Sequence, residues 1–295
     1  MKFFDESVLE NAIDMHIHSG PDHMARYADC ITLSQEAAKY KMRAYVAKAP
    51  LISTVAGAQA ANLVVPEVLA VGSLTLNNPT GGLSPRAVVA NARAGAKVIW
   101  LPTVDSAFSV LKDQQKHWIG HFVKTSSFGY PIEPLSVLDG EGRLKPEAQE
   151  ILRLAKEMDL VLCSGHISPA ECIALAEEAA AIGYRKFEIT HANAWTEDFT
   201  LEVLKRLTAC GATVSLSYGV CSPTHGRQDP REIVGIIREI GADHCILITD
   251  YGQTISPPPA VGMLVFYNLL KSLDVSREEL DLMLKTKPAE LLGLD

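Results

Sequence analysis

Five side chains with metal-binding chemistry stand at separate points along the chain. His16 and His18 lie two residues apart in the segment D-M-H-I-H. In a strand, side chains two apart point to the same face, so the two imidazoles present a chelate geometry for zinc or a similar ion. His166, His191 and Asp250 directly follow or close the apolar runs LVLCSG, KFEIT and CILIT. Among nine histidines an H-x-H pair arises easily by chance, so it gains meaning only if the fold brings further ligands to it.

The elements that must position these side chains follow from an alternation of short β-branched runs with amphipathic stretches. Strands separated by helical patterns of about 10–15 residues are typical of a parallel sheet. Near-continuous apolar runs such as VIWLP and CILIT fit strands that are covered on both faces, as in parallel barrels. The sequence therefore predicts an α/β fold, a (β/α)8 TIM barrel, which suits a length of 295 residues. The predicted strands are 12–18, 43–49, 68–76, 97–102, 160–164, 186–190, 213–217 and 244–249.

Helix-start signals fall between the predicted strands. Ser84 and Asp229 each precede a proline, and Ser168 and Ser276 each precede a glutamate by three residues, as in a capping box. No linker rich in glycine, serine or charge divides the chain. Residues 1–295 are therefore expected to form a single barrel domain that ends in C-terminal helices.

The longest stretch without a predicted strand, about 104–142, follows the fourth strand and contains His117, His121 and Lys124. A segment of this length in a compact domain is usually functional or has local structure of its own. In (β/α)8-barrel enzymes, the loops that follow the strands lie on the face that contains the active site. Two interpretations stay open: an insertion that covers the site, with His121 contacting the substrate, or a helical insertion on the surface.

His166, His191 and Asp250 each follow a predicted strand, and His16 and His18 end another. Because the carboxyl ends of parallel barrel strands meet at one rim, all five side chains are expected to converge there. Taken singly, each histidine is more often a hydrogen-bonded rim residue, and an aspartate after a strand is often a helix cap. The coincidence of five such positions favours a common metal site.

With these positions the chain resembles the amidohydrolase superfamily of metal-dependent (β/α)8 barrels. That family places H-x-H after strand 1, a histidine after strand 5, another after strand 6 and an aspartate after strand 8. The resemblance extends to the tail, where T-K-P-A-E-L-L-G-L is similar to the N-P-A-x-L-L-G-L ending of these enzymes, with Lys287 in place of asparagine. It implies that the metal ligands are His16, His18, His166, His191 and Asp250.

One departure from the family pattern concerns the number of metal ions. Binuclear members usually bridge two metals with a carboxylated lysine or a glutamate, most often after strand 4, where this chain has W-L-P-T. Lys48, at the end of 43–49, is the lysine expected to reach the pocket, but it stands on another strand. We therefore expect one tightly bound divalent ion and leave a second open. Zinc is the first expectation, and manganese or iron suits the same ligand types.

The resemblance also implies roles for individual residues. The ion activates a water and polarises the bond to be cleaved. Asp250 takes the proton of this water and relays it to the leaving group. His191 either completes the coordination of a second ion or stabilises developing negative charge. Lys48 is a candidate clamp for a substrate carboxylate or phosphate, with a salt bridge at the rim as an equally weighted alternative.

Further residues are expected around the ligands. Asp14, two positions before His16, is expected on the same strand face, where it either orients a ligand imidazole or bonds to a neighbouring strand. Three residues that follow predicted strands are expected to line the pocket mouth and contact the substrate: Asn77, Thr103 and Tyr218.

The function predicted from these residues is that of a metal-dependent hydrolase acting on an amide, cyclic amide, lactone or similar ester bond of a small polar molecule. A mononuclear decarboxylase or deaminase with the same ligands is the second hypothesis, which the missing strand 4 bridge favours. A barrel that binds metal or ligand without turnover is the third. No G-x-S-x-G or G-x-G-x-x-G segment occurs, so neither a serine nucleophile nor a dinucleotide is indicated.

Composition excludes several classes of partner. Lys and Arg total 27 against 35 Asp and Glu, a net charge of -8, which disfavours nucleic acid. The longest apolar run, 260–270, is shorter than the roughly 20 residues that span a bilayer, and the N-terminus lacks the apolar segment of a secretory signal. We therefore expect a cytoplasmic protein with no membrane partner, and self-association stays open. The six cysteines form no C-x-x-C pair and are expected to be reduced thiols.

Overall fold

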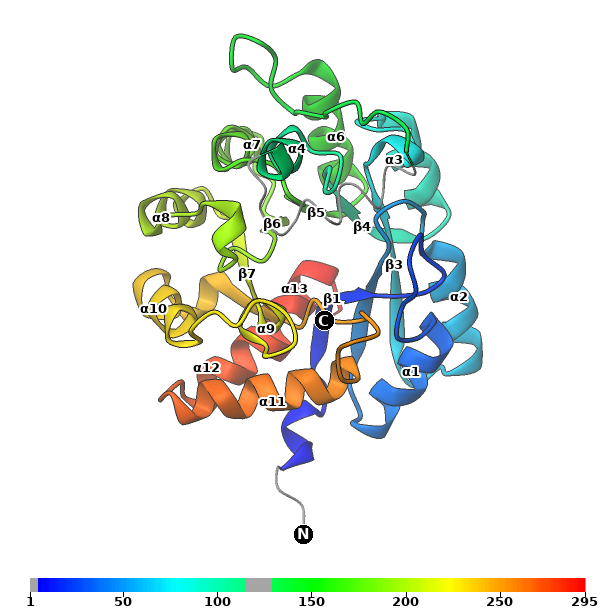
Figure 1. Ribbon diagram of the computed structural model, residues 1–295, viewed down its shortest axis with the longest axis vertical. Helices are drawn as coiled ribbons and strands as arrows, with labels where there is room; N and C mark the ends of the chain where they lie inside the picture. The colour runs from blue at the N-terminus through cyan, green and yellow to red at the C-terminus, as the bar shows by residue number, and fades with distance from the viewer. Residues whose placement is uncertain (1–4, 115–128, 295) are drawn as a thin grey trace.

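The computed structural model describes residues 5–114 and 129–294 of the chain. Within these residues eight parallel strands follow one another in sequence order around a ring, with helices on the outside (Figure 1). This is the predicted (β/α)8 barrel, and each strand begins and ends within two residues of its predicted limits. The strands are β1 (Ile13–His18), β2 (Ala44–Lys48), β3 (Leu69–Thr75), β4 (Ala96–Trp100), β5 (Val161–Cys163), β6 (Phe187–Ile189), β7 (Thr213–Ser217) and β8 (Cys245–Ile248).

Most helices begin where the capping residues predict. Side chains of Ser84, Ser168 and Ser276 cap α3, α7 and α12. Asp229 is not the cap of α10, because this helix starts one residue later, with Pro230 as its N-cap, and the Asp229 carboxylate accepts a bond from the amide two residues on. The α-helices are α1 (Cys30–Lys39), α2 (Val55–Val64), α3 (Pro85–Arg93), α4 (Ala107–Gln114), α6 (Pro146–Glu157), α7 (Pro169–Ala181), α8 (Leu201–Ala209), α9 (Tyr218–Cys221), α10 (Arg231–Ile240), α11 (Pro259–Ser272), α12 (Arg277–Asp281) and α13 (Lys287–Leu292). Short 3-10 turns are η1 (Glu6–Leu9), η2 (Asn78–Thr80), η3 (Trp195–Glu197) and η4 (Ala242–His244), and η5 (Leu282–Thr286) is a π-helical turn.

The core has two parts, one inside the barrel and one between the strands and the helices. The inner part consists of branched side chains from alternate strand positions, such as Val98 and Ile246, together with Trp100. Leu291 and Leu292 of α13 belong to this inner cluster. The carbonyl of Leu294 accepts a hydrogen bond from Arg43, which immediately precedes β2. The tail motif therefore packs against the end of the barrel where the strands begin.

The barrel closes where β8 returns to β1. The carboxylate of Asp14 accepts hydrogen bonds from the hydroxyl of Thr249 at 2.5 Å and from its backbone nitrogen at 3.2 Å. The backbone nitrogen of Asp250 donates to the carbonyl of His16 at 3.0 Å, and that of His18 donates to Tyr251 at 2.7 Å. This seam places the end of β8 beside the end of β1.

The segment after β4 is described in part, as α4 and residues 129–142. Its backbone forms a short parallel bridge between Ser106 and Leu135, and the Ser106 hydroxyl donates to the carbonyl of His166 at 2.7 Å. This part of the segment therefore packs against the loop after β5. His117, His121 and Lys124, and with them the predicted substrate contact of His121, lie outside the described residues.

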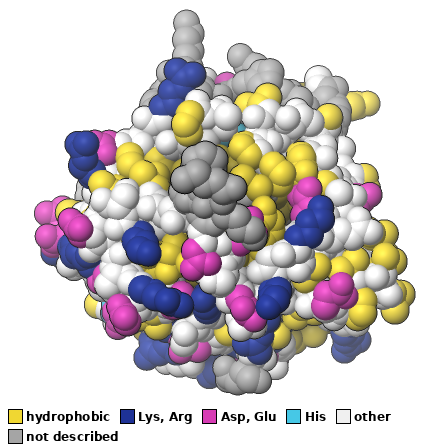
Figure 2. All heavy atoms as spheres, turned by 90° about the horizontal axis from the view of Figure 1, so that it is seen from below, with side chains coloured by type: hydrophobic (Ala, Val, Ile, Leu, Met, Phe, Trp, Pro, Cys, Tyr) yellow, Lys and Arg dark blue, Asp and Glu magenta, His cyan; other side chains and the backbone are white. Residues whose placement is uncertain are grey.

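The surface and the thiols agree with the composition. On the face seen in Figure 2, Lys and Arg side chains alternate with Asp and Glu, and neither sign gathers into a large patch. None of the helices in the described ranges has the length and apolar character that a membrane span requires. All six cysteines are free.

Candidate metal centre

Three of the predicted ligands meet where β1 and β8 end. Nε2 of His16 lies 3.1 Å from Oδ1 of Asp250, and Nε2 of His18 lies 3.2 Å from the same oxygen. The centroids of the two imidazole rings are 5.2 Å apart. Ligand atoms about 2.0–2.2 Å from one zinc ion in tetrahedral geometry lie about 3.3–3.5 Å from one another. The spacing of these three side chains therefore fits a shared cation.

A register shift in β1 separates the face of Asp14 from that of the histidine pair. Asp14 pairs with Tyr45 of β2, whereas His18 pairs with Lys48, so β1 takes four steps (14 to 18) where β2 takes three (45 to 48). Such a bulge turns the alternating side chains of a strand over to the other face. The expectation that Asp14 shares a face with the histidine pair is therefore wrong, whereas the alternative that it bonds to a neighbouring strand is confirmed by its hydrogen bonds to Thr249 at the end of β8.

Asp250 stands on a sharp turn at the end of β8. Its φ of 56° is in the left-handed region, which aspartate tolerates better than most residues. Two residues on, Gly252 has a φ of 122°, and a Cβ there would lie 1.9 Å from the carbonyl oxygen of His18. The loop can pass this close to β1 only with glycine at that position. Together these constraints hold the Asp250 carboxylate against the two imidazoles.

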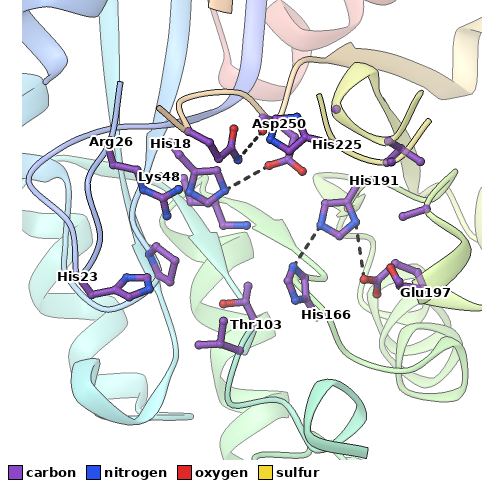
Figure 3. A pocket seen from close by; sticks show the side chains of 18 residues that line it. His18, His23, Arg26, Lys48, Thr103, His166, His191, Glu197, His225 and Asp250 are labelled. Carbon is purple, nitrogen blue, oxygen red and sulfur yellow. Dashed lines mark hydrogen bonds and ion pairs between the residues drawn. The ribbon is translucent and has the colours of Figure 1, made fainter. Parts of the chain in front are cut away.

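Two further predicted ligands meet at the ends of β5 and β6. Nε2 of His191 lies 3.2 Å from Nε2 of His166. The other ring nitrogen of His191, Nδ1, lies 3.8 Å from Oε1 of Glu197 in the loop after β6. The His16 and His191 rings are only 5.9 Å apart, so the two groups of ligands adjoin each other. Figure 3 shows His18 and Asp250 of the first group near His191 of the second. In each group, every side chain offers a ligand atom within 4.8 Å of the others.

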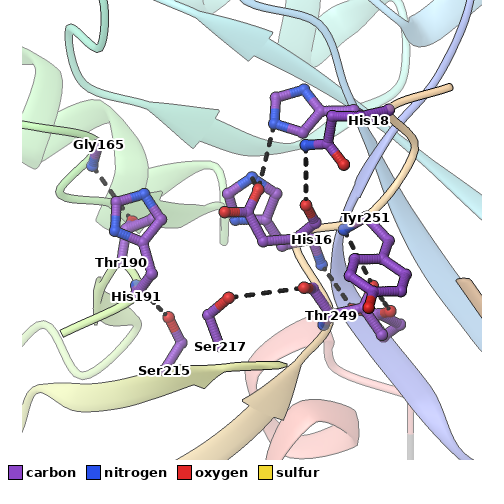
Figure 4. Close-up of polar contacts among 12 residues, drawn as sticks. His16, His18, Gly165, Thr190, His191, Ser215, Ser217, Thr249 and Tyr251 are labelled. Carbon is purple, nitrogen blue, oxygen red and sulfur yellow. Dashed lines mark hydrogen bonds and ion pairs between the residues drawn. The ribbon is translucent and has the colours of Figure 1, made fainter. Parts of the chain in front are cut away.

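Hydroxyl groups hold the backbone beneath this second group. The backbone nitrogen of His191 donates to Oγ of Ser215 at 2.8 Å, and Thr190 accepts from the amide of Gly165 at 3.2 Å (Figure 4). His191 has a φ of 34°, which costs about 1–3 kcal/mol for a residue other than glycine. These hydrogen bonds hold the residue in that strained conformation.

Burial keeps the four imidazoles neutral. It lowers the pKa of His18 and of His191 to about 4, and it lowers the pKa values of His16 and His166 well below the usual value. A neutral imidazole offers a lone pair to a metal. Within the described ranges, Nδ1 of His16, of His18 and of His191 has no hydrogen-bond partner. Buried nitrogens left in this way cost free energy, and a bound cation would relieve part of that cost.

The two carboxyl groups of the pocket differ in charge. Burial opposes ionisation of Asp250, but the imidazoles of His16 and His18 outweigh it and hold the pKa of this carboxyl well below its usual range. Burial raises the pKa of Glu197 to about 8. At neutral pH the pocket therefore holds one carboxylate, Asp250, and one carboxylic acid, Glu197.

The pocket at the carboxyl ends of the strands receives side chains from most of the loops on that face. It encloses about 960 Å³ of empty space when the open solvent at its mouth is included. Of the predicted substrate contacts, Lys48 and Thr103 line it. His18, His166, His191 and Asp250 of the predicted ligands line it as well.

Two predicted substrate contacts do not line this pocket. The amide of Asn77 is fully buried: it donates to the carbonyl of Pro50 and to the hydroxyl of Thr103, each at 2.8 Å, and accepts from the backbone of Thr103. Asn77 therefore ties together the loops after β2, β3 and β4. The ring of Tyr218 stacks on Phe266 of α11 with their centroids 5.3 Å apart, so it packs against the helical layer.

Among the lining residues that sequence reasoning missed, four have ionisable side chains. Arg26 and His23 come from the loop after β1, Glu197 from the loop after β6, and His225 from the loop after β7. None is adjacent to a strand end, so the rule that located the ligands does not reach them. The signal available for Glu197 was a charged residue in W-T-E-D, which an exposed loop would show equally.

The fold is shared with solved structures of low sequence identity. An amidohydrolase from Pseudomonas aeruginosa aligns over 97% of both chains with a TM-score of 0.64 and 10% identity. An organophosphorus hydrolase from Deinococcus radiodurans aligns over 98% of this chain and 94% of its own, with a TM-score of 0.61 and 14% identity. A probable dipeptidase from Pseudomonas aeruginosa aligns over 98% of this chain and 96% of its own, with a TM-score of 0.61 and 9% identity. The barrel that the resemblance implied is thereby confirmed.

Comparisons of sequence give a family and no individual relative. None of the curated proteins matches the chain. Residues 11–215 match the family described as "Family of unknown function (DUF6282)", a stretch that includes His16, His18, Lys48, His166 and His191. Because this match covers well over half of the 295 residues, the chain belongs to the DUF6282 family.

Proposed function

We propose that this chain is a metal-dependent hydrolase that cleaves an amide, cyclic amide, lactone or similar ester bond of a small polar substrate. The observation that carries the proposal is the meeting of four neutral imidazoles and one ionised carboxylate, from the ends of the four strands β1, β5, β6 and β8, around a single pocket. The solved structures with this fold include an amidohydrolase, an organophosphorus hydrolase and a probable dipeptidase, which supports a hydrolase.

A divalent ion fits the group formed by His16, His18 and Asp250 best. These residues offer two neutral nitrogens and one anionic oxygen, and catalytic zinc sites commonly use three protein ligands and keep one position open. His166 and His191 offer two nitrogens to a second, weaker metal site. When bound, such an ion acts as a Lewis acid, which lowers the pKa of water and polarises the bond to be cleaved. We propose zinc, and manganese or iron suits the same donors.

Asp250 is the proton acceptor of the proposed reaction. Both of its imidazole contacts use Oδ1, so Oδ2 is available to a water molecule in the pocket. The carboxylate is ionised at neutral pH and can accept the proton of a water that attacks the carbonyl carbon. The proton then passes to the nitrogen or oxygen that leaves when its bond to that carbon breaks.

Glu197 has a positioning part in this proposal. Its Oε1 faces Nδ1 of His191, and Nε2 on the other side of the same ring faces His166. A carboxyl group behind an imidazole fixes the orientation and tautomer of the ring. At 3.8 Å the two atoms are too far apart for a hydrogen bond in this structure, and we propose that Nδ1 donates to Oε1 when Nε2 of His191 binds a metal.

Metal analysis of the purified protein tests the proposal. We expect at least one equivalent of zinc, manganese or iron, loss of that metal in His18→Ala, and hydrolysis of some member of a panel of amides and lactones that chelation abolishes and added metal restores. His244→Ala is the matched control, since His244 is partly exposed in η4, away from the pocket. Metal content that His18→Ala leaves unchanged contradicts the proposal, and carbon dioxide release without a hydrolysis product indicates a decarboxylase instead.

A further inference from the structure

The buried ammonium of Lys48 is the charged group of the pocket that the proposed reaction leaves without a task. Lys48 ends β2, pairs in register with His18 and is only 2% exposed. Its Nζ lies 4.3 Å from the centroid of the Trp100 ring, a cation–π contact. Across residues 5–114 and 129–294 it forms no ion pair or hydrogen bond, so the salt bridge considered as an alternative from the sequence is absent there.

An unpaired buried ammonium is costly, because burial removes the water that would solvate it. Asp250 and Glu188 act on Lys48 through their charge, but neither comes close enough to form an ion pair. The Trp100 ring contacts the ammonium on one side, and Lys48 lines the pocket. Its three N–H donors are thus not matched by acceptors of the described chain, and an anion in the pocket would match them.

Arg26 provides a second cation on the same side of the pocket. Figure 3 shows Arg26 and Lys48 beside His18, and Glu197 on the opposite side beyond His191. The guanidinium of Arg26 binds the Asp22 carboxylate through Nε and Nη2, each at 2.6 Å. These two contacts leave Nη1 without an acceptor in the described part of the chain and cancel the charge of Arg26 with that of Asp22.

The balance of charge distinguishes a carboxylate from a phosphate. Arg26 and Asp22 cancel, so in the metal-free protein this side of the pocket has one uncompensated positive charge, that of Lys48. A carboxylate carries one negative charge, whereas a phosphate monoester carries about 1.5–2 at neutral pH. The single charge therefore matches a carboxylate.

We propose that Lys48, with Arg26 beside it, forms a carboxylate-binding subsite, and that the substrate is a small molecule with a carboxylate next to the bond that is cleaved. The substrate class rests on the proposed hydrolase function, whereas the binding of a carboxylate by Lys48 does not. Because the subsite lies beside His18, the carboxylate fixes which end of the substrate approaches Asp250. Glu197, on the opposite side of the pocket, faces the end of the substrate that does not carry the carboxylate.

Calorimetric titration of the purified protein with butyrate, butyramide and inorganic phosphate tests the subsite without any turnover. Butyrate and butyramide have nearly the same shape and differ in charge. We expect the protein to bind butyrate at least about 10-fold more tightly than butyramide or phosphate, and Lys48→Met to weaken butyrate by about 10- to 100-fold while leaving butyramide unchanged. Lys205→Met, which removes an exposed lysine paired with Glu239, is the control and should behave as the unaltered protein.

Three results overturn the proposal: butyrate affinity that Lys48→Met leaves unchanged, Lys48-dependent binding of phosphate that exceeds that of butyrate, or loss of metal from the Lys48→Met protein. The same titration after chelation separates binding at Lys48 from binding at a metal. Lys48→Gln, judged by circular dichroism, replaces the methionine variant if that protein does not fold.

A second measurement distinguishes failure of the subsite from failure of the hydrolase function. Pairs of amides or lactones with and without an adjacent carboxylate are compared by kcat/KM, and we expect a preference of at least about 10-fold for the carboxylate that Lys48→Met removes. Hydrolysis of both members at equal rates overturns the subsite and supports the hydrolase. Lys48-dependent butyrate binding with no hydrolysis of any substrate supports the subsite and contradicts the hydrolase.

Discussion

Replacing Lys48 by methionine should make the metal-free protein more stable, although it removes a residue proposed to bind substrate. Burial lowers the pKa of Lys48 from 10.5 to about 8. Each pKa unit corresponds to about 1.4 kcal/mol, so the folded state bears a penalty of about 3 kcal/mol for the charged lysine at pH 7. Methionine has a similar length and no charge, so the substitution removes this penalty and leaves little empty space.

The cation–π contact reduces this gain. Nζ of Lys48 over the Trp100 ring, at 4.3 Å, contributes up to about 2 kcal/mol in a desolvated site. A methionine sulfur near the same ring restores about 0.3–1.5 kcal/mol of it. We therefore expect the free energy of unfolding of Lys48→Met to exceed that of the unaltered protein by about 1–3 kcal/mol at pH 7.

The pH dependence gives the sharper measurement. Above pH 8 the folded lysine loses its proton while the unfolded lysine keeps it until about pH 10.5, so the unaltered protein gains stability as the pH rises through this range. The penalty falls below about 1 kcal/mol at pH 10, and the difference from Lys48→Met shrinks or reverses accordingly. Urea unfolding of chelator-treated protein at pH 7 and pH 10 measures both values, with Lys205→Met as control, expected within about 0.5 kcal/mol of the unaltered protein. A destabilised Lys48→Met protein at pH 7 would refute the reasoning and show that the ammonium has a stabilising partner.

Three further outcomes are expected. His16→Ala abolishes bound metal and turnover, because it removes a chelating nitrogen, whereas Cys163→Ser keeps both; elemental analysis and activity assays check this pair. Asp250→Asn folds normally but lowers kcat by about 100- to 10,000-fold, because an amide accepts no proton from water. Glu171→Ala lowers the free energy of unfolding by about 2–4 kcal/mol in urea titrations, because this buried carboxylate accepts hydrogen bonds from Ser168 and from the loop before α6. A loss below about 0.5 kcal/mol contradicts that reasoning.

The strands and most helix starts could be predicted because local sequence determines them. The runs of buried apolar residues in β4 and β8 admit few arrangements other than strands covered on both faces. The caps at Ser168 and Ser276 act through residues three positions away, within the reach of a sequence pattern. The convergence of the five side chains at the strand ends could be predicted as well, because the carboxyl ends of parallel barrel strands all lie at one rim.

The rest depends on contacts between distant segments. The face occupied by Asp14 follows from a one-residue bulge that appears only when β1 pairs with β2. Asn77 follows a strand as the ligands do, but its amide forms hydrogen bonds with the neighbouring loops and does not reach the pocket. Glu197 enters the pocket because the loop after β6 folds back toward His191, and no short pattern in the sequence encodes that path.

Within the ranges that the structure describes, strained backbone, an unpaired charge and polar atoms without partners come together at the carboxyl ends of the strands. His191 and Asp250 hold left-handed backbone conformations, each at a cost of up to about 3 kcal/mol, and Lys48 adds an unpaired buried charge. At the other end, where the strands begin, Leu291 and Leu292 fill the interior with apolar contacts. Sites that bind ligands are expected to combine strain with unsatisfied polar groups, because the ligand supplies the missing partners. Binding of a metal and a carboxylate should therefore raise the free energy of unfolding. We expect the stabilisation to be largest at the seam between β1 and β8, where Asp250 and His16 meet.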